Sequence, residues 1–240
     1  MLTLLVADIH LHPSRPQTAR LFGDFLAGKA KAAHALYILG DLFDAWAGDD
    51  DLADPFNAGI CATLKTLAQT GTQVFFLPGN RDFLVGDDFA AASGATLIAD
   101  ETIVDLGGVP TLLLHGDTLC DDDRAYQDFR ATVRAPHWRR EFLARPLAQR
   151  KAEIEALRGR SEQEKQTKRM TLMDASEATM LAAFRRHGVG RIIHGHTHRM
   201  ARHVYNVDGR PCERWVLDDW DDDARALACD EGGCRLLKLQ

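Results

Sequence analysis

The stretch RIIHGHTH, Arg191 to His198, joins a short apolar run to three histidines at alternate positions. The apolar run predicts a buried β-strand, so the histidines would stand at the end of that strand. On an extended backbone alternate side chains point the same way, which would let several imidazoles face one point. Imidazole is the commonest metal ligand, but a solvated turn rich in histidine has the same pattern. This stretch alone leaves a metal site and a solvated turn as alternatives.

Four other apolar runs also end in side chains that can bind a metal ion or a phosphate. In an open α/β sheet the ligand site lies beyond the carboxyl ends of the strands, so residues that follow different strands converge there. Each motif alone can be a helix cap or a tight turn, whereas five together predict a shared site. The four further sets are Asp8 and His10 in LLVADIH, Asp41 and Asp44 in YILGDLFD, Asn80, Arg81 and Asp82 in FFLPGNRD, and His115 and Asp117 in LLLHGD.

Apolar runs alternate with helical patterns over the first 77 residues. This rhythm predicts βαβ units and an α/β fold with a partly parallel sheet. Hairpins are expected over residues 103–115, 205–216 and 229–239, because apolar runs flank turn residues there.

Residues 121–187 are helical in pattern and rich in charge, with SEQEKQ (161–166) expected as a flexible connector. An insertion of this size, at a point where functional loops emerge, is more often a lid than a packing accident. The sequence therefore predicts a core made of residues 1–120 and 188–240. Residues 121–187 would form a helical cap over the site.

Composition narrows the class of protein. The chain has 240 residues, of which 45% are apolar, and this is enough to bury a core. No apolar run approaches the roughly 20 residues of a spanning helix, and the start lacks signal-peptide features, which predicts a cytoplasmic location. The five cysteines are odd in number and scattered, which argues against a disulfide framework and agrees with a reducing compartment. The close-spaced pair Cys229 and Cys234 is expected to flank a hairpin turn rather than to bind a metal.

Charge is distributed unevenly. The formal net charge is -6, yet residues 130–170 contain 12 Lys and Arg against 5 Asp and Glu. A basic segment in an acidic protein indicates a phosphorylated ligand or an anionic membrane surface, with a solvated helix face as the alternative. The net acidity and the lack of a long aromatic and basic stripe argue against nucleic acid as a partner.

The kinds of ligand in the five motifs favour particular metals. Carboxylate, amide and imidazole groups without thiolates favour Mn²⁺, with Fe²⁺, Zn²⁺ or Mg²⁺ as alternatives. Seven such ligands exceed the needs of one catalytic ion, but they suit two ions that share a bridging carboxylate. Such a pair can lower the pKa of a water between the ions and clamp the oxygens of an in-line phosphoryl displacement.

The motifs DIH, GDLFD, GNRD, HGD and GHTH, in this order from residue 8 to residue 198, resemble those of the calcineurin-like metallophosphoesterases. The resemblance implies a four-layer αββα sandwich, in which helices flank two packed sheets. It implies a first metal ion held by Asp8, His10, Asp41 and His198, and a second held by Asp41, Asn80, His115 and His196. Asp41 would bridge the two ions, and His194 would lie outside the ligand set.

The longer segments GNRDFL, LHGDTLCDDDRAYQDFR, MDAS and IIHGHTHR resemble the UDP-2,3-diacylglucosamine diphosphatases, a branch that acts in lipid A assembly in Gram-negative bacteria. Enzymes of this branch use Mn²⁺ and cleave the diphosphate to give UMP and 2,3-diacylglucosamine 1-phosphate. The resemblance implies that the substrate contacts are Asn80, Arg81, Asp123, Tyr126, Ser161, Lys165, Lys168 and His196.

Arg81 stands where many members of the superfamily have a histidine that serves as a general acid or a phosphate ligand. An arginine cannot give up a proton at neutral pH, but it can clamp a phosphate with two hydrogen bonds. A site without that acid suits a leaving group that departs unprotonated, such as a phosphate released from a diphosphate.

A substrate with two acyl chains implies an apolar lining for the cap, because each buried methylene contributes about 0.8 kcal/mol. FLARPL (142–147), IEAL (154–157) and MTLMDASEATMLAAF (170–184) can supply it, unless they pack on the body as ordinary amphipathic faces. A lipid substrate also implies peripheral attachment to the anionic cytoplasmic face of the inner membrane. No protein partner is expected.

Two other functions are compatible with the same motifs. A soluble phosphodiesterase or phosphatase of this fold would act on small nucleotides and would need no acyl chains. A non-catalytic scaffold would bind a partner through the cap, and an eroded ligand set would favour it. In this chain every ligand position of the motifs has a residue that can bind a metal, which favours an enzyme.

Overall fold

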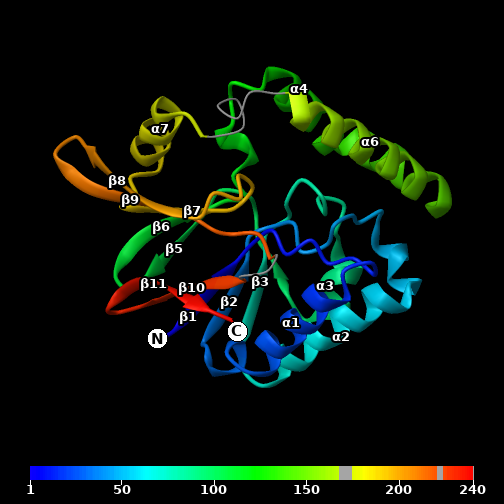
Figure 1. Cartoon of the computed structure of the whole chain (residues 1–240), viewed down its shortest axis with the longest axis horizontal. Helices are drawn as coiled ribbons and strands as arrows, with labels where there is room; N and C mark the ends of the chain where they lie inside the picture. The colour runs from blue at the N-terminus through cyan, green and yellow to red at the C-terminus, as the bar shows by residue number, and fades with distance from the viewer. Residues whose placement is uncertain (168–174, 221–223, 240) are drawn as a thin grey trace.

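Two β-sheets form the centre of the protein (Figure 1), seen in a computed structural model that describes residues 1–167, 175–220 and 224–239. Within these residues the first sheet has six strands, in the order β11 (Gly233–Lys238), β10 (Arg225–Asp230), β1 (Thr3–Val6), β2 (Ala35–Ile38), β3 (Gln73–Phe76) and β4 (Thr96–Leu97). The second has five, in the order β5 (Thr102–Leu106), β6 (Val109–Leu113), β7 (Arg191–His194), β9 (Arg210–Val216) and β8 (Ala201–Val207).

The directions of the strands agree with those predicted from the sequence. Strands β1 to β4 are parallel to one another, and so are β6, β7 and β9. The pairs β5–β6, β8–β9 and β10–β11 are antiparallel hairpins. The predicted partly parallel sheet and the three predicted hairpins are therefore confirmed.

Helices cover the outer face of each sheet (Figure 1). On the first sheet lie α1 (Pro16–Ala27), α2 (Pro55–Gln69) and α3 (Asp87–Ser93), and on the second lies α7 (Glu177–His187). Local sequence defines the ends of these helices: the Asp54 side chain accepts a hydrogen bond at the start of α2, and Ser176 does so at the start of α7. Among the described helices, none has both the length and the apolarity that a membrane crossing needs.

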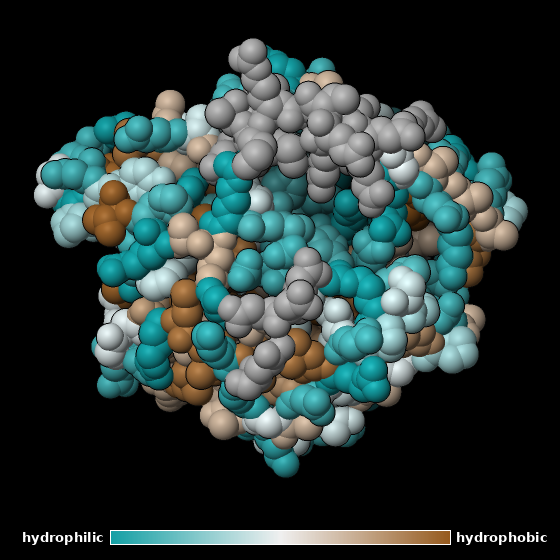
Figure 2. Space-filling model, in the orientation of Figure 1, coloured by the Kyte–Doolittle hydropathy of each residue, from teal (hydrophilic) through white to brown (hydrophobic). Residues whose placement is uncertain are grey.

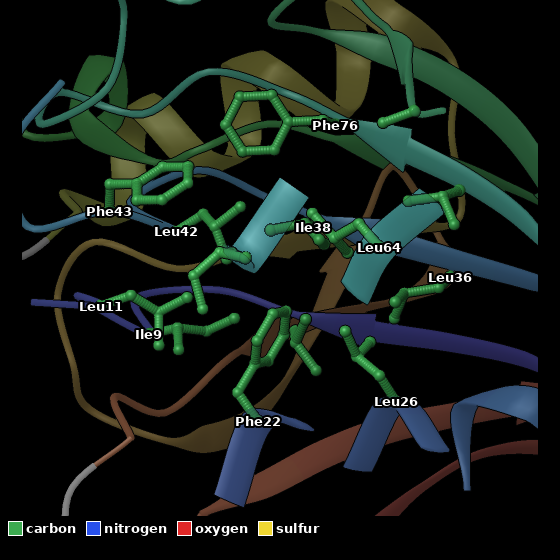
Figure 3. Packing of buried hydrophobic residues seen from close by; sticks show 14 of the residues in the cluster. Ile9, Leu11, Phe22, Leu26, Leu36, Ile38, Leu42, Phe43, Leu64 and Phe76 are labelled. Carbon is green, nitrogen blue, oxygen red and sulfur yellow. The ribbon is translucent and has the colours of Figure 1, made fainter. Parts of the chain in front are cut away.

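Apolar side chains from α1 fill the space beside the first sheet. In Figure 3, Phe22 and Leu26 point from α1 into the same cluster as Leu36 and Ile38 of β2. All four side chains are at most 2% exposed. This burial explains why the apolar residues of α1 recur at helical spacing.

Alternation along the strands separates the layers. In β1, Leu4 belongs to the cluster beneath the helices, whereas Leu5 belongs to the cluster between the two sheets. In β7, Ile193 faces the other sheet, and Ile192 packs with Phe184 of α7. Three clusters thus lie between four layers, and the expected αββα sandwich is confirmed.

Three further helices stand beyond the carboxyl ends of the first sheet: α4 (Arg124–Arg134), α5 (Pro136–Leu143) and α6 (Leu147–Thr167) (Figure 1). Ion pairs attach α6 to the loops of the body, and they join Arg150 to Asp50, Lys151 to Asp51 and Arg158 to Asp44. Part of the excess positive charge of residues 130–170 is therefore balanced by the body rather than facing solvent.

Two expectations for the inserted segment are wrong. The SEQEKQ stretch, 161–166, continues α6 instead of forming a connector. In MTLMDASEATMLAAF, residues 170–174 lie outside the described residues, and residues 177–184 belong to α7, whose Met180 and Phe184 are buried against the second sheet. For this helix the alternative interpretation, an amphipathic face packed on the body, is the correct one.

The cysteine pair at the end of the chain is joined. Cys229 and Cys234 lie opposite each other in the β10–β11 hairpin and form a disulfide. The hairpin itself was expected, but the argument from an odd and scattered cysteine count is wrong for this pair. Cys61, Cys120 and Cys212 are buried and form no disulfide among the described residues.

Candidate metal centre and the cavity beside it

The loops that follow the strands bring the predicted ligands together. Asp8 follows β1 and Asp41 follows β2, so both stand at the carboxyl edge of the first sheet. His115 follows β6 of the second sheet and meets them there. Ligand atoms of Asp8, Asp41 and His115 all lie within 4.8 Å of one another, and so do those of Asp8, His10 and His198.

Asn80 and His196 complete the cluster. The Asn80 Oδ1 atom lies 2.9 Å from His115 Nε2 and 3.0 Å from His196 Nδ1. His10 Nε2 lies 3.4 Å from His198 Nε2. All seven predicted ligands therefore lie in one continuous group. His194 is fully buried at the end of β7, and its Nδ1 bonds to the Gly195 carbonyl instead.

The backbone at the cluster is left-handed at five of the predicted ligands. The φ angles are 53° at Asp8, 51° at His10, 54° at Asp41, 68° at His196 and 52° at His198. Such angles are uncommon for residues other than glycine and collect at functional sites. The expectation that an extended backbone aims alternate histidines is therefore wrong, because tight turns after the strands aim them.

Burial and neighbouring charges shift the pKa values of the cluster in opposite directions. Burial raises the pKa of Asp41 to about 7. Burial alone would raise the pKa of Asp8, but the neighbouring imidazoles of His198, His115 and His10 together outweigh burial and hold this pKa below its usual range. Burial lowers the pKa of His10 to about 4 and that of His196 to about 3. Two of the imidazoles are therefore neutral at pH 7, as metal ligands must be.

The cluster fits a divalent cation. Burial lowers the pKa of His115, but Asp41 and Asp8 outweigh burial and raise it to about 9. In the metal-free site a protonated His115 therefore offsets part of the negative charge of Asp41 and Asp8. A bound cation would offset more of that charge. The buried Asp8 Oδ1 accepts no hydrogen bond from any described residue. Buried carboxylate oxygens are normally paired or bound to a metal.

Asp82 holds two of the ligand loops together. It is fully buried, and Oδ2 accepts hydrogen bonds from the backbone N–H groups of Leu42 and Phe43. Oδ1 accepts from the N–H groups of Asp41 and Gly79. The loop after β2 is thereby tied to the loop after β3. The sequence placed Asp82 at a strand end but gave no sign of this role, since the four bonds depend on loop geometry.

A second carboxylate, Asp117, anchors the first helix of the inserted segment. Its Oδ2 lies 2.7 Å from both Tyr126 Oη and Arg130 Nε. Arg130 also reaches Asp100, whose other oxygen accepts a hydrogen bond from the His115 N–H. Asp117 thus supports α4, and it lies outside the two groups of clustered ligand atoms. Because the Tyr126 hydroxyl donates to Asp117, it can only accept a hydrogen bond from a substrate.

A cavity of about 410 Å³ adjoins the cluster, and Figure 2 shows the surface hollowed between α6 and the body. Five of the predicted ligands line it: His10, Asp41, Asn80, His196 and His198. The lining also contains large apolar side chains, those of Trp46, Phe83, Trp138, Phe142, Ile154 and Leu157. FLARPL and IEAL therefore contribute to the lining as expected.

Four arginines also line the cavity: Arg81, Arg130, Arg134 and Arg158. Asp123 and Tyr126, two of the predicted substrate contacts, line it as well. The side chains of Ser161 and Lys165, and the whole of Lys168, lie outside the described residues. Their contacts with substrate stay predictions.

Comparison with known proteins gives the family. The calcineurin-like phosphoesterase family matches residues 1–200. A relative from Aromatoleum aromaticum named UDP-2,3-diacylglucosamine hydrolase is 52% identical over 233 residues, 97% of this chain and 95% of the relative. Relatives of the same name are 47% identical in Cellvibrio japonicus, over 98% of both chains, and 46% identical in Xanthomonas campestris pv. campestris, over 100% and 99%. The chain therefore belongs to the calcineurin-like phosphoesterase family.

Proposed function

We propose that the protein hydrolyses the diphosphate of UDP-2,3-diacylglucosamine and releases UMP and 2,3-diacylglucosamine 1-phosphate, a step of lipid A biosynthesis. The observation that carries the proposal is the continuity of a phosphoesterase ligand cluster with an apolar cavity. Hydrolysis of a small soluble diester needs no such cavity. The names of the nearly full-length relatives support the same substrate.

Two Mn²⁺ ions are the proposed cofactors. The first would be held by Asp8, His10, Asp41 and His198, and the second by Asp41, Asn80, His115 and His196. Bound ions of this kind activate water as the nucleophile and stabilise the charge that develops on the phosphoryl oxygens. The mixture of oxygen and imidazole ligands without thiolates supports Mn²⁺ over softer metals.

The arginines of the cavity would position the diphosphate. Arg81 follows Asn80 directly, and its backbone N–H donates to Asp41 Oδ1 at 2.8 Å. Its guanidinium is permanently charged and can hold a phosphate with two hydrogen bonds. The leaving phosphate departs as an anion, so no proton donor is required. Tyr126 would accept a hydrogen bond from a hydroxyl or amide N–H of the sugar.

The apolar side chains of the cavity would shelter the acyl chains. In this proposal α4, α5 and α6 form the cap within the inserted residues 121–187, and residues 1–120 and 188–240 form the core. Phe142 and Ile154 lie on cap helices and line the cavity together with Trp46 of the body. Each methylene that leaves water there contributes about 0.8 kcal/mol to binding.

Exposed residues of the cap would rest on the cytoplasmic face of the inner membrane. Phe129 of α4, which also lines the cavity, is 43% exposed, and Leu143 of α5 is 37% exposed; both are large apolar side chains. Arg124 and Arg140 are exposed on the same two helices and would attract anionic lipid. Sedimentation with anionic vesicles at low salt tests this attachment, and a protein that stays in the supernatant would contradict it.

The experiment that tests the function is UMP release by the Mn²⁺-loaded protein. We would compare UDP-2,3-diacylglucosamine with UDP-N-acetylglucosamine and with a soluble aryl phosphodiester. The proposal requires a strong preference for the acylated substrate. Equal or faster turnover of the aryl diester would instead support a soluble phosphodiesterase and would remove the acyl role of the cavity.

A further inference from the structure

Asp219 stands directly behind one of the proposed metal ligands. His198 Nδ1 lies 3.2 Å from Asp219 Oδ2. The other ring nitrogen, Nε2, faces the ligand cluster and lies 3.4 Å from both Asp8 Oδ1 and His10 Nε2. The imidazole therefore turns one nitrogen toward the cluster and the other toward a carboxylate outside it.

The segment that carries Asp219 is held on both sides. Leu217 N–H donates to the carbonyl at the end of β7 at 2.7 Å, and Trp220 N–H donates to the Asp8 carbonyl at 3.3 Å. The Trp220 side chain is fully buried and packs edge-on against two phenylalanines of α1. Arg15 donates to the Trp220 carbonyl at 3.1 Å. Asp219 is thus fixed by its backbone neighbours and is unlike a free surface carboxylate.

A second histidine of the cluster is oriented in the same manner. His115 Nδ1 lies 2.9 Å from the Leu39 carbonyl oxygen, and its Nε2 faces Asn80 and Asp41. A carbonyl oxygen can only accept, so His115 Nδ1 carries the proton in this bond. An ionised carboxylate can also only accept. By the same reasoning His198 carries a proton on Nδ1.

We infer that Asp219 is a positioning residue for the metal centre: it holds the proton of His198 on Nδ1, fixes the ring, and leaves the Nε2 lone pair for a divalent cation. The inference rests on the ligand role of His198 in the proposed function and not on the choice of substrate. Carboxylates behind ligand histidines raise the basicity of the ligand, and their loss commonly weakens metal binding 10- to 100-fold.

The test is a titration of the metal-free protein with Mn²⁺, followed by calorimetry and by the electron paramagnetic resonance of free Mn²⁺. Asp219→Ala is expected to weaken one class of site by about 10- to 100-fold and to leave the other class unchanged. Asp219→Asn keeps an oxygen acceptor but loses the charge, so we expect a smaller loss. Asp24→Ala is the matched control, because Asp24 is an exposed carboxylate on α1 with no role at the site. Thermal unfolding of each metal-free variant shows whether it is folded.

Mn²⁺ affinities of Asp219→Ala that match those of Asp24→Ala would overturn the inference. If Asp219→Ala does not fold, the test rests on Asp219→Asn. Wild-type Mn²⁺ affinity of Asp219→Asn at both sites would then overturn the inference. Failure of the wild-type protein to release UMP would overturn the proposed substrate only. A lowered Mn²⁺ affinity of the Asp219 variants would still support the positioning role in that case.

Discussion

The bonds of Asp82 lead to a quantitative prediction for Asp82→Ala. The carboxylate accepts hydrogen bonds at 2.8 Å from the N–H groups of Leu42 and Gly79, and at 3.3 Å from those of Asp41 and Phe43. Alanine leaves all four donors without this acceptor in a fully buried position. The two loops that these donors belong to carry two of the proposed metal ligands, Asp41 and Asn80.

The magnitude follows from the two short bonds. A buried donor left unsatisfied costs about 1–3 kcal/mol, so the two short bonds together account for about 2–6 kcal/mol. Burial raises the pKa of Asp82, which means that the ionised carboxylate already bears a desolvation cost that alanine removes. We therefore expect the free energy of unfolding to fall by about 2–4 kcal/mol. For a chain of this size that is a drop in Tm of roughly 4–16 °C.

Urea and thermal unfolding in EDTA measure this loss, with Asp24→Ala as the control. Asp82→Asn should retain the Oδ1 bonds but place an amide N–H₂ against the N–H groups of Leu42 and Phe43. Its free energy of unfolding should therefore lie between those of the wild type and Asp82→Ala. Mn²⁺ affinity should decrease in both Asp82 variants, since the ligand loops lose their common anchor. A free energy of unfolding for Asp82→Ala within about 0.5 kcal/mol of the control would refute the reasoning.

Three further predictions concern the centre and the cap. Asp41→Asn should abolish activity yet stabilise the metal-free protein at pH 8 by about 1–2 kcal/mol. Burial raises the pKa of Asp41 from 3.8 to about 7, so the wild type loses stability as the pH rises through that range, and the difference in Tm should vanish near pH 4. Arg81→Ala should lower kcat/KM by about 100-fold with nearly unchanged Mn²⁺ content by metal analysis, because it removes a charge-assisted phosphate contact; loss of the metal would contradict its assigned role. Arg150→Ala should cost about 1–3 kcal/mol in urea unfolding and speed proteolysis of α6, because Arg150 is buried and tied to Asp50 and the Ala47 carbonyl; unchanged cleavage would show that other contacts hold the helix.

The sequence predicted which residues the structure gathers into one cluster, because strand ends are local features. Asp8, Asp41 and His115 each follow an apolar run, and parallel strands bring such positions to one edge whatever the details of packing. The rhythm of apolar runs likewise predicted the sheets and hairpins. These features depend on neighbouring residues along the chain and on simple topological rules.

Contacts between distant segments escaped prediction. Asp219 meets His198 only because the chain returns to the first sheet after β9, and the acidic run around it has no pattern of its own. The polar composition of SEQEKQ suggested a connector. Its residues also have high helix propensity, and α6 continues through them. The sequence could not show whether the apolar face of α7 packs on the second sheet or lines the cap, since either position needs an apolar helical face.

The left-handed backbone at five of the proposed ligands has a consequence for the evolution of such a site. Each residue other than glycine in this conformation costs of the order of 1 kcal/mol, and the cost falls on the fold whether or not a cation is bound. The proposed function requires a carboxylate or an imidazole at these turns, although glycine adopts the same backbone without steric cost. In a lineage that abandoned the chemistry, we expect those turns to be the first to change, while the sandwich beneath them stays intact.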